Sequence, residues 1–110
     1  MQTRSMSLIF LITVILPGAG AARAQDTSAG MQIAQAWCSD CHLVDPRERK
    51  SGRNSAPTFF SIARMKSTTE ASLAAFLTTP RGRGHMPNVV LNRQEIQDVS
   101  TYILSLRTLR

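Results

Sequence analysis

The 110-residue chain has little of what disulfide-rich and β-sheet proteins contain, with two cysteines, one tryptophan and one tyrosine. The two cysteines lie three positions apart, so a disulfide between them would close a very small loop and add little stability. No stretch of four or more β-favouring residues alternates with a period of two, and no internal repeat appears. The sequence therefore predicts one all-α domain that something other than a disulfide stabilises.

Acidic residues are fewer than basic ones, with 7 Asp and Glu against 13 Lys and Arg and a formal net charge of +6. This excess is modest, and the basic residues form no stripe interleaved with aromatic residues, as the surfaces of nucleic-acid-binding proteins do. We therefore expect no nucleic-acid partner.

The chain has one long apolar run, which lies near its N-terminus. Residues 8–16 (LIFLITVIL) follow the positive charge of Arg4, and residues 22–24 (ARA) supply the small residues of a signal-peptidase site. The run is shorter than the roughly 20 residues that a membrane-spanning helix needs. We expect residues 1–24 to be a cleaved signal peptide, and residues 25–110 to form an exported, periplasmic domain without a membrane span.

Apolar residues at helical spacing predict helices over 29–38 and 68–78, a third after Asn92, and a short one over 58–65. The third is the clearest, because four apolar residues recur along it: Ile96, Val99, Ile103 and Leu106. Two polar loops, 45–57 and 80–91, separate these helices. Loops of about 12 residues or more are usually functional or disordered, so these two need an explanation.

Two pairs of residues have the spacing of a capping box, in which two side chains satisfy the first backbone N–H groups of a helix. Ser67 and Glu70 precede the second predicted helix, and Asn92 and Glu95 precede the third. We therefore expect Ser67 and Asn92 to be the residues at which these helices begin.

Cys38, Cys41 and His42 form the motif C-x-x-C-H, for which three sites are candidates. A thioredoxin-like redox pair requires a βαβ context, which the sequence does not predict. A zinc site requires four ligands, and since His85 is the one other histidine, a carboxylate would have to complete it. The third candidate is covalent attachment of c-type haem, for which this motif is the signature.

Haem chemistry explains the spacing of the motif. Two thiols on one helical turn can reach both vinyl groups of a haem as thioethers, and the histidine beside the second thiol then lies under the iron. We therefore expect one haem c, bound covalently through Cys38 and Cys41, with His42 as the proximal ligand of its iron.

On these residues the chain resembles the small bacterial class I cytochromes c, and the resemblance covers nearly all of residues 25–110. Gly30 and Tyr102 match the contact at which the family's N- and C-terminal helices cross, and DVSTYILSL matches its C-terminal helix. HMPN matches the segment that carries the distal methionine. The resemblance implies the cytochrome c fold, with three to four short helices and long loops around one covalently bound haem.

The resemblance also implies the remaining site residues. Met86 is the expected sixth ligand of the iron, and Pro87 biases it toward extended backbone, so its thioether can project from a loop. His85 is the competing ligand. Pro57, in NSAPTF, matches the family proline whose backbone carbonyl accepts the other N–H of His42, although it would also end a loop before a helix.

The chain departs from many family members in one respect, the tryptophan that holds a haem propionate. Its one tryptophan, Trp37, directly precedes Cys38, and we expect it to be a packing residue. The candidate propionate partners are basic residues of the first loop: Arg47, Arg49, Lys50 and Arg53.

With both axial positions filled, a haem iron cannot readily bind a substrate, so we expect single-electron transfer between respiratory or dehydrogenase partners and no enzymatic activity. The alternatives are a haem peroxidase or gas sensor with a labile sixth ligand, and an electron-relay subunit of a larger oxidoreductase. Four basic residues would steer a monomeric carrier toward an acidic patch on a transient redox partner: Arg64, Lys66, Arg81 and Arg83.

Overall fold

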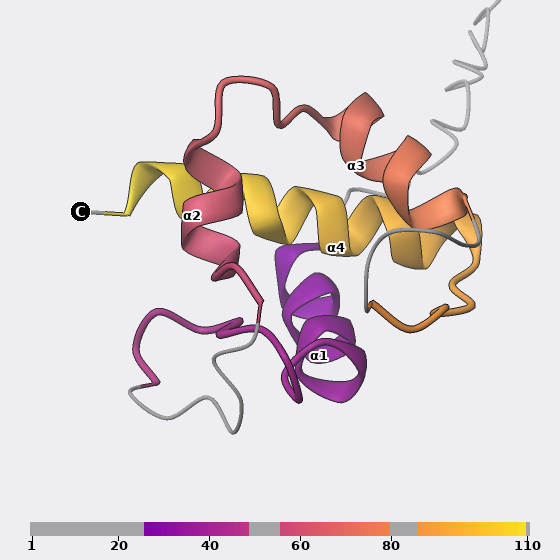
Figure 1. Cartoon of the computed structure of the whole chain (residues 1–110), viewed down its shortest axis with the longest axis horizontal. Helices are drawn as coiled ribbons and strands as arrows, with labels where there is room; N and C mark the ends of the chain where they lie inside the picture. Colours follow the sequence, from indigo (N-terminus) through magenta and orange to yellow (C-terminus); the bar gives the residue numbers. More distant parts are fainter. Residues whose placement is uncertain (1–25, 49–55, 80–85, 110) are drawn as a thin grey trace, which may run out of the picture.

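The computed structural model describes residues 26–48, 56–79 and 86–109, which form helices joined by loops (Figure 1). In chain order the elements are α1 (Thr27–Trp37), α2 (Phe59–Arg64), α3 (Glu70–Thr78), α4 (Arg93–Ser105) and the short 3-10 helix η1 (Leu106–Thr108). These segments contain no β-strand. The all-α class is confirmed. The expected signal peptide, residues 1–24, lies outside the described residues.

Helix α1 crosses α4 at a glycine (Figure 1). A Cβ atom added to Gly30 would lie 2.7 Å from the Cβ atom of Tyr102 and closer still to the backbone oxygen of Asp98. Carbon atoms pack at roughly 3.5–4.0 Å, so no side chain fits at this position. Glycine therefore allows the backbones of the two helices to approach each other closely, at the position that the resemblance implies.

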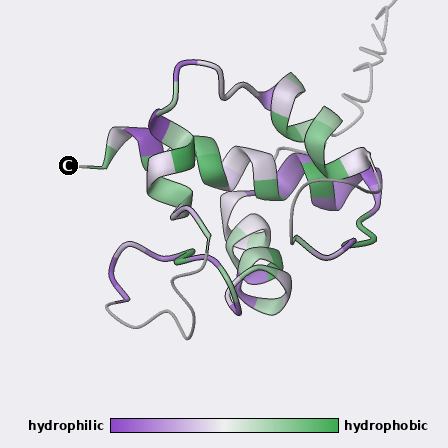
Figure 2. Ribbon diagram, in the orientation of Figure 1, coloured by the Kyte–Doolittle hydropathy of each residue, from purple (hydrophilic) through white to green (hydrophobic). Residues whose placement is uncertain are grey.

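Helix α4 supplies much of the apolar core. The four residues predicted to recur at helical spacing are all buried: Ile96, Val99 and Ile103 on α4, and Leu106 at the start of η1. Val99, Ile103 and Leu106 form one core cluster with residues from the rest of the chain, among them Val44, Phe59, Ala63 and Leu73. Figure 2 shows hydrophilic and hydrophobic residues alternating along α4, which is the pattern of a helix that is buried on one side. In the part of the chain that is described, no helix is both long and apolar enough to cross a bilayer.

The predicted capping box of α4 is confirmed. The side-chain oxygen of Asn92 accepts the N–H of Glu95 at 2.9 Å, and the Glu95 carboxylate accepts the N–H of Asn92 at 2.7 Å. Two backbone donors that helix formation leaves without a partner are thus satisfied at the start of α4.

The predicted capping box of α3 is wrong, because Thr69 begins the helix and Ser67 does not. The hydroxyl of Thr69 accepts the N–H of Ser72 at 3.0 Å, and the hydroxyl of Ser72 accepts the N–H of Thr69 at 2.8 Å. The backbone of Thr69 is extended, which aims its short side chain at the first turn. Glu70 is consequently the first helical residue, and Ser67 contributes its carbonyl oxygen to the Ser72 hydroxyl.

The C-terminal end of the chain docks on α2. The Arg107 guanidinium, in η1, donates to the carbonyl oxygens of Ala63 and Thr68, both at 2.7 Å. These two carbonyls lie at either end of the turn that joins α2 to α3, so one side chain of η1 holds that turn against the end of α4.

Candidate haem-binding site

The C-x-x-C-H motif continues the last turn of α1. The N–H of Cys38 donates to the carbonyl oxygen of Ala34 at 2.8 Å, as in a helix. The N–H groups of Cys41 and His42 both donate to the carbonyl oxygen of Cys38, at 3.2 and 2.9 Å. Both cysteines are free thiols and half-buried. The fold therefore places the three side chains of the motif on one turn at the end of α1, a helix that packs closely against α4 at Gly30.

Burial keeps the thiol of Cys38 protonated. Desolvation raises its pKa to about 11, because the thiolate would lose its hydration. Catalytic thiols of redox C-x-x-C pairs have lowered pKa values, since the thiolate is the nucleophile. The environment of Cys38 is thus the opposite of what a thioredoxin-like pair requires.

The ring of His42 is held from two sides. Its Nδ1 lies 2.6 Å from the carbonyl oxygen of Pro57, and its centroid lies 5.4 Å from that of Phe59, with the rings tilted by 52°. A carbonyl oxygen only accepts hydrogen bonds, so Nδ1 carries the proton of the neutral ring. The lone pair is then on Nε2, which is the form of histidine that binds a metal.

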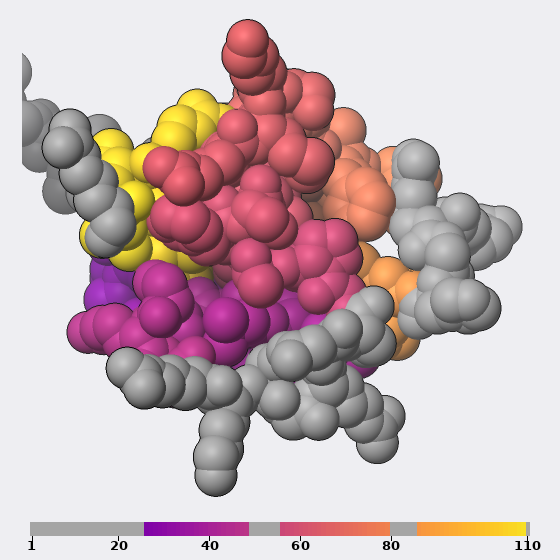
Figure 3. Space-filling model, turned by 60° about the vertical axis from the view of Figure 1, so that its left-hand side comes forward, coloured from indigo at the N-terminus to yellow at the C-terminus, as the bar shows by residue number. Residues whose placement is uncertain are grey.

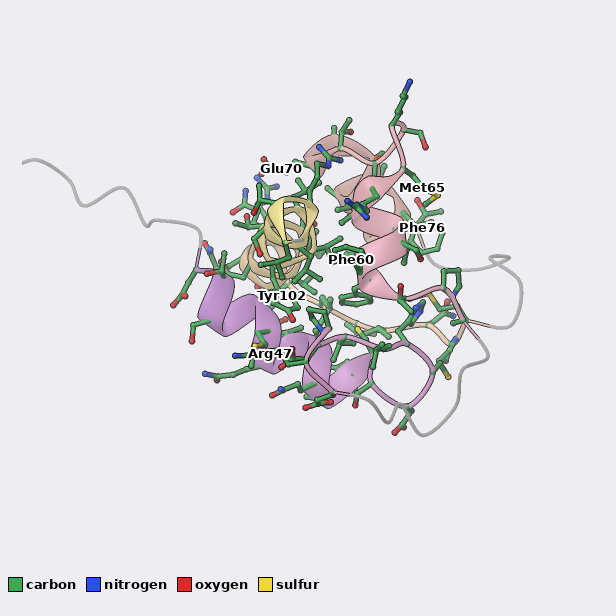
Figure 4. All side chains as sticks on the ribbon, turned by 90° about the vertical axis from the view of Figure 1, so that its left-hand side faces the viewer. Arg47, Phe60, Met65, Glu70, Phe76 and Tyr102 are labelled. Carbon is green, nitrogen blue, oxygen red and sulfur yellow. The ribbon has the colours of Figure 1, made fainter. Side chains whose placement is uncertain are left out.

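The segment after the motif is fastened to α4 by a buried hydrogen bond. The hydroxyl of Tyr102 donates to the carbonyl oxygen of Val44 at 2.7 Å, and both residues are buried. Burial also raises the pKa of Tyr102, so it keeps this proton. Figure 4 shows Tyr102 between α4 and α1. The sequence predicts Tyr102 at the helix crossing but does not predict this hydrogen bond.

Asp45 and Arg47 form an ion pair beside this hydrogen bond. The Asp45 side chain is 7% exposed, and its two oxygens accept from the Arg47 Nε at 3.0 Å and from a terminal guanidinium nitrogen at 2.9 Å. These hydrogen bonds lower the pKa of Asp45 below its usual value. The Arg47 guanidinium is therefore already hydrogen-bonded to Asp45, which counts against Arg47 as a partner of a haem propionate. The other three candidates, Arg49, Lys50 and Arg53, lie outside the described residues.

A cavity of about 260 Å³ lies between the end of α3, the segment that contains Met86, and α4. The half-buried side chain of Met86 forms part of its wall, together with residues of α3 and α4 and of the segment between them: Phe76, Leu77, Thr78, Thr79, Pro87, Asn88, Val89, Val90, Leu91 and Ile96. Most of these side chains are apolar. The hydroxyls of Thr78 and Thr79 donate back to the carbonyl oxygens of α3, to Ala74 and Ala75. The cavity is thus a partly open, mostly apolar space with a methionine in its wall.

The prediction that Trp37 is a packing residue is wrong, because its side chain is 61% exposed. Its spacing from Gly30 and Ala34 places it on the same stripe of α1. The crossing with α4, however, lies at Gly30, and seven residues at 1.5 Å per residue carry Trp37 about 10 Å beyond it. The indole at that distance from the crossing is exposed.

The expected basic residues divide between described and undescribed parts of the chain. Arg64 and Lys66 are exposed at the end of α2, and the Arg64 guanidinium lies 4.6 Å above the ring of Phe60. Arg81, Arg83 and the competing ligand His85 lie outside the described residues. Within the described residues, no three His, Cys, Asp or Glu side chains come together in a group that could hold a metal ion.

The chain is similar to two curated c-type cytochromes. Cytochrome c-552 of Bradyrhizobium diazoefficiens is 33% identical over 99 residues, which are 90% of this chain and 92% of the relative. Cytochrome c6 of Rippkaea orientalis is 35% identical over 107 residues, covering 93% of this chain and 92% of the relative. No protein-family model matches the chain, and no solved structure matches it significantly.

Both similarities extend over nearly the whole chain, and the helical fold described above agrees with them. Electron carriage, and not catalysis, is what such a fold and such relatives have in common. The chain therefore belongs to the small class I c-type cytochromes, and its cofactor is a covalently bound haem c.

Proposed function

We propose that this cytochrome is a periplasmic electron carrier whose haem is tethered by Cys38 and Cys41 and whose iron is held by His42 and Met86. The observation that carries the assignment is the contact between Nδ1 of His42 and the carbonyl oxygen of Pro57, at 2.6 Å. It leaves the lone pair of His42 on Nε2, and it orients the ring independently of any cofactor.

The described residues fit a c-type haem. Two half-buried free thiols lie on the turn that also carries His42, which supports two thioether bonds beside one axial ligand. The haem, when bound, supplies the one-electron couple of its iron. The chain holds the ring of His42, and the hydrogen bond to Pro57 raises the basicity of that ligand.

Met86 is proposed as the sixth ligand because its thioether lies in the wall of an apolar cavity. Most of the side chains around it are apolar, and a thioether is compatible with apolar surroundings. The pairing of histidine with methionine raises the reduction potential relative to other haem ligands. With both axial positions filled by the chain itself, electrons pass through the haem edge and no substrate reaches the iron.

The location and partners are proposed from sequence and charge. The pattern of residues 1–24 supports export and cleavage after Ala24. Arg64 and Lys66 are exposed, which supports attraction of a respiratory or dehydrogenase partner that presents an acidic patch. Electron-transfer complexes bury little surface, so a monomeric carrier that exchanges partners rapidly is expected.

Mass spectrometry of the protein, expressed in a periplasm that attaches c-type haem, tests the assignment. The intact mass after denaturation should equal residues 25–110 plus one haem. A Cys38→Ala/Cys41→Ala double variant should lose the haem on denaturation. Retention of haem by that variant would contradict the tether, and a mass that includes residues 1–24 would contradict cleavage.

A further inference from the structure

Trp37 is the last residue of α1 and the one tryptophan of the chain, and its side chain is 61% exposed. A single exposed apolar residue needs no explanation by itself. Trp37 differs from the other exposed apolar residues because it directly precedes Cys38. Consecutive Cα atoms lie about 3.8 Å apart, so the exposed indole is attached one peptide away from the proposed haem tether.

The backbone under Trp37 is fixed. The N–H of Cys38 donates to Ala34 at 2.8 Å, and the Ser39 hydroxyl donates to the carbonyl oxygen of Gln35 at 2.5 Å, which closes the last turn of α1. The same helix is pinned to α4 at Gly30. A large aromatic side chain on a rigid backbone loses little conformational entropy when a partner covers it.

The charges near Trp37 favour an apolar contact over an electrostatic one. From residue 26 to residue 46 the chain contains no lysine or arginine, and Asp40, inside the motif, is an exposed acidic residue. Of the described basic residues, Arg64 and Lys66 lie at the end of α2, and the guanidinium of Arg47 is paired with Asp45. Figure 3 shows the segment that follows α1 at the surface of the molecule. Among the described residues, the stretch of chain around Trp37 therefore offers a partner an aromatic surface and no basic side chain of its own.

We propose that Trp37 is the apolar anchor with which this cytochrome docks onto a redox protein that presents an apolar face. The proposal rests on the function proposed above, because it takes Cys38 to be the haem tether. Tryptophan is among the residues that dominate the energy of small interfaces, and it does so when water is excluded from its ring. A partner docked at Trp37 would lie next to Cys38, the residue proposed to tether the haem.

Electron self-exchange of the holoprotein tests the proposal, because the second copy carries the same Trp37 surface. The rate is measured by NMR line broadening in mixtures of oxidised and reduced protein. Trp37→Ala should lower it roughly tenfold, the effect of losing one central contact, and Trp37→Phe should retain most of it. Leu109→Ala is the matched control, because Leu109 is also exposed, at 44%, but lies beyond η1. Its rate should equal that of the wild type.

Oxidation by ferricyanide and the midpoint potential complete the test. Neither requires a protein contact, so both should be unchanged in Trp37→Ala. Equal self-exchange rates in Trp37→Ala and the wild type would overturn the proposal. A changed midpoint potential in Trp37→Ala would also overturn it, because Trp37 would then act on the haem itself. A wild-type protein without covalent haem would be recognised first by its spectrum, as a failure of the proposed function.

Discussion

At the scale of single residues, the site depends on a backbone oxygen as much as on side chains. The group that holds His42 is the carbonyl of Pro57, at 2.6 Å, and every amino acid has that carbonyl. The identity of residue 57 therefore matters only through the conformation of the chain before α2.

Replacement of Pro57 by alanine should accordingly leave the haem spectrum and midpoint potential nearly unchanged. The variant should unfold more readily, by about 0.4–1 kcal/mol, because the unfolded chain gains freedom when proline is removed. Guanidinium unfolding of the holoprotein measures this difference. A large shift in midpoint potential would mean that the proline ring itself, and not its carbonyl, positions His42.

Asp45 should make stability depend on pH. Hydrogen bonds from Arg47 lower the pKa of Asp45 in the folded protein. The ionised carboxylate therefore stabilises the fold fully at pH values above the pKa of an unfolded aspartate, about 3.9. That contribution is lost as the pH falls through the lower folded value. Asp45→Asn should therefore be less stable than the wild type at pH 7, and the gap should close in acid. A gap that stays constant in guanidinium unfolding across this range would contradict the role of the charge.

Replacement of Ser100 by alanine should make the protein more stable. Its side chain is 0% exposed, and among the described residues its hydroxyl is a buried group without a hydrogen-bond partner. Burying such a group costs about 1–3 kcal/mol, so Ser100→Ala should raise the free energy of unfolding by up to about that amount. Ser105→Ala is the control, because the hydroxyl of Ser105 donates to the carbonyl oxygen of Tyr102. A loss of stability in Ser100→Ala would reveal a partner for this hydroxyl.

At the scale of elements, the crossing of α1 and α4 determines where the haem motif lies. A Cβ at position 30 would meet the backbone of Asp98 and the Cβ atom of Tyr102. Gly30→Ala should therefore destabilise the holoprotein by about 1–3 kcal/mol. Glycine to alanine inside a helix is otherwise stabilising by about 1 kcal/mol, so the sign measured by guanidinium unfolding decides between close packing and helix propensity.

Sequence patterns predicted the elements well where the determining contacts are local. The cap of α4 and its buried stripe depend on residues three or four positions apart, and both were correct. The cap of α3 was misplaced because Ser67 and Thr69 both have hydroxyls, and the path of the backbone decides which one faces the helix. The prediction for Trp37 was wrong because helical spacing does not show where along a helix its neighbour crosses it.

At the scale of the whole molecule, the haem motif could be predicted because it lies within five consecutive residues. The contacts that support it could not, since they join positions far apart in the chain. Tyr102 donates to Val44, 58 residues away, and Arg107 donates to Ala63, 44 residues away. Such pairs follow from the path of the chain in space, which neither spacing nor composition encodes. The first contact holds the segment after the haem motif against α4, and the second holds the end of α2 against η1.

Carbon monoxide binding to the reduced holoprotein tests the ligation of the iron by His42 and Met86 most directly. The visible spectrum of the wild type should not change with carbon monoxide, because the chain fills both axial positions. Met86→Ala should bind carbon monoxide promptly, whereas His85→Ala should behave as the wild type does. Prompt binding by the wild type would contradict the account and favour a sensor with an open site. Binding by His85→Ala alone would make His85 the sixth ligand.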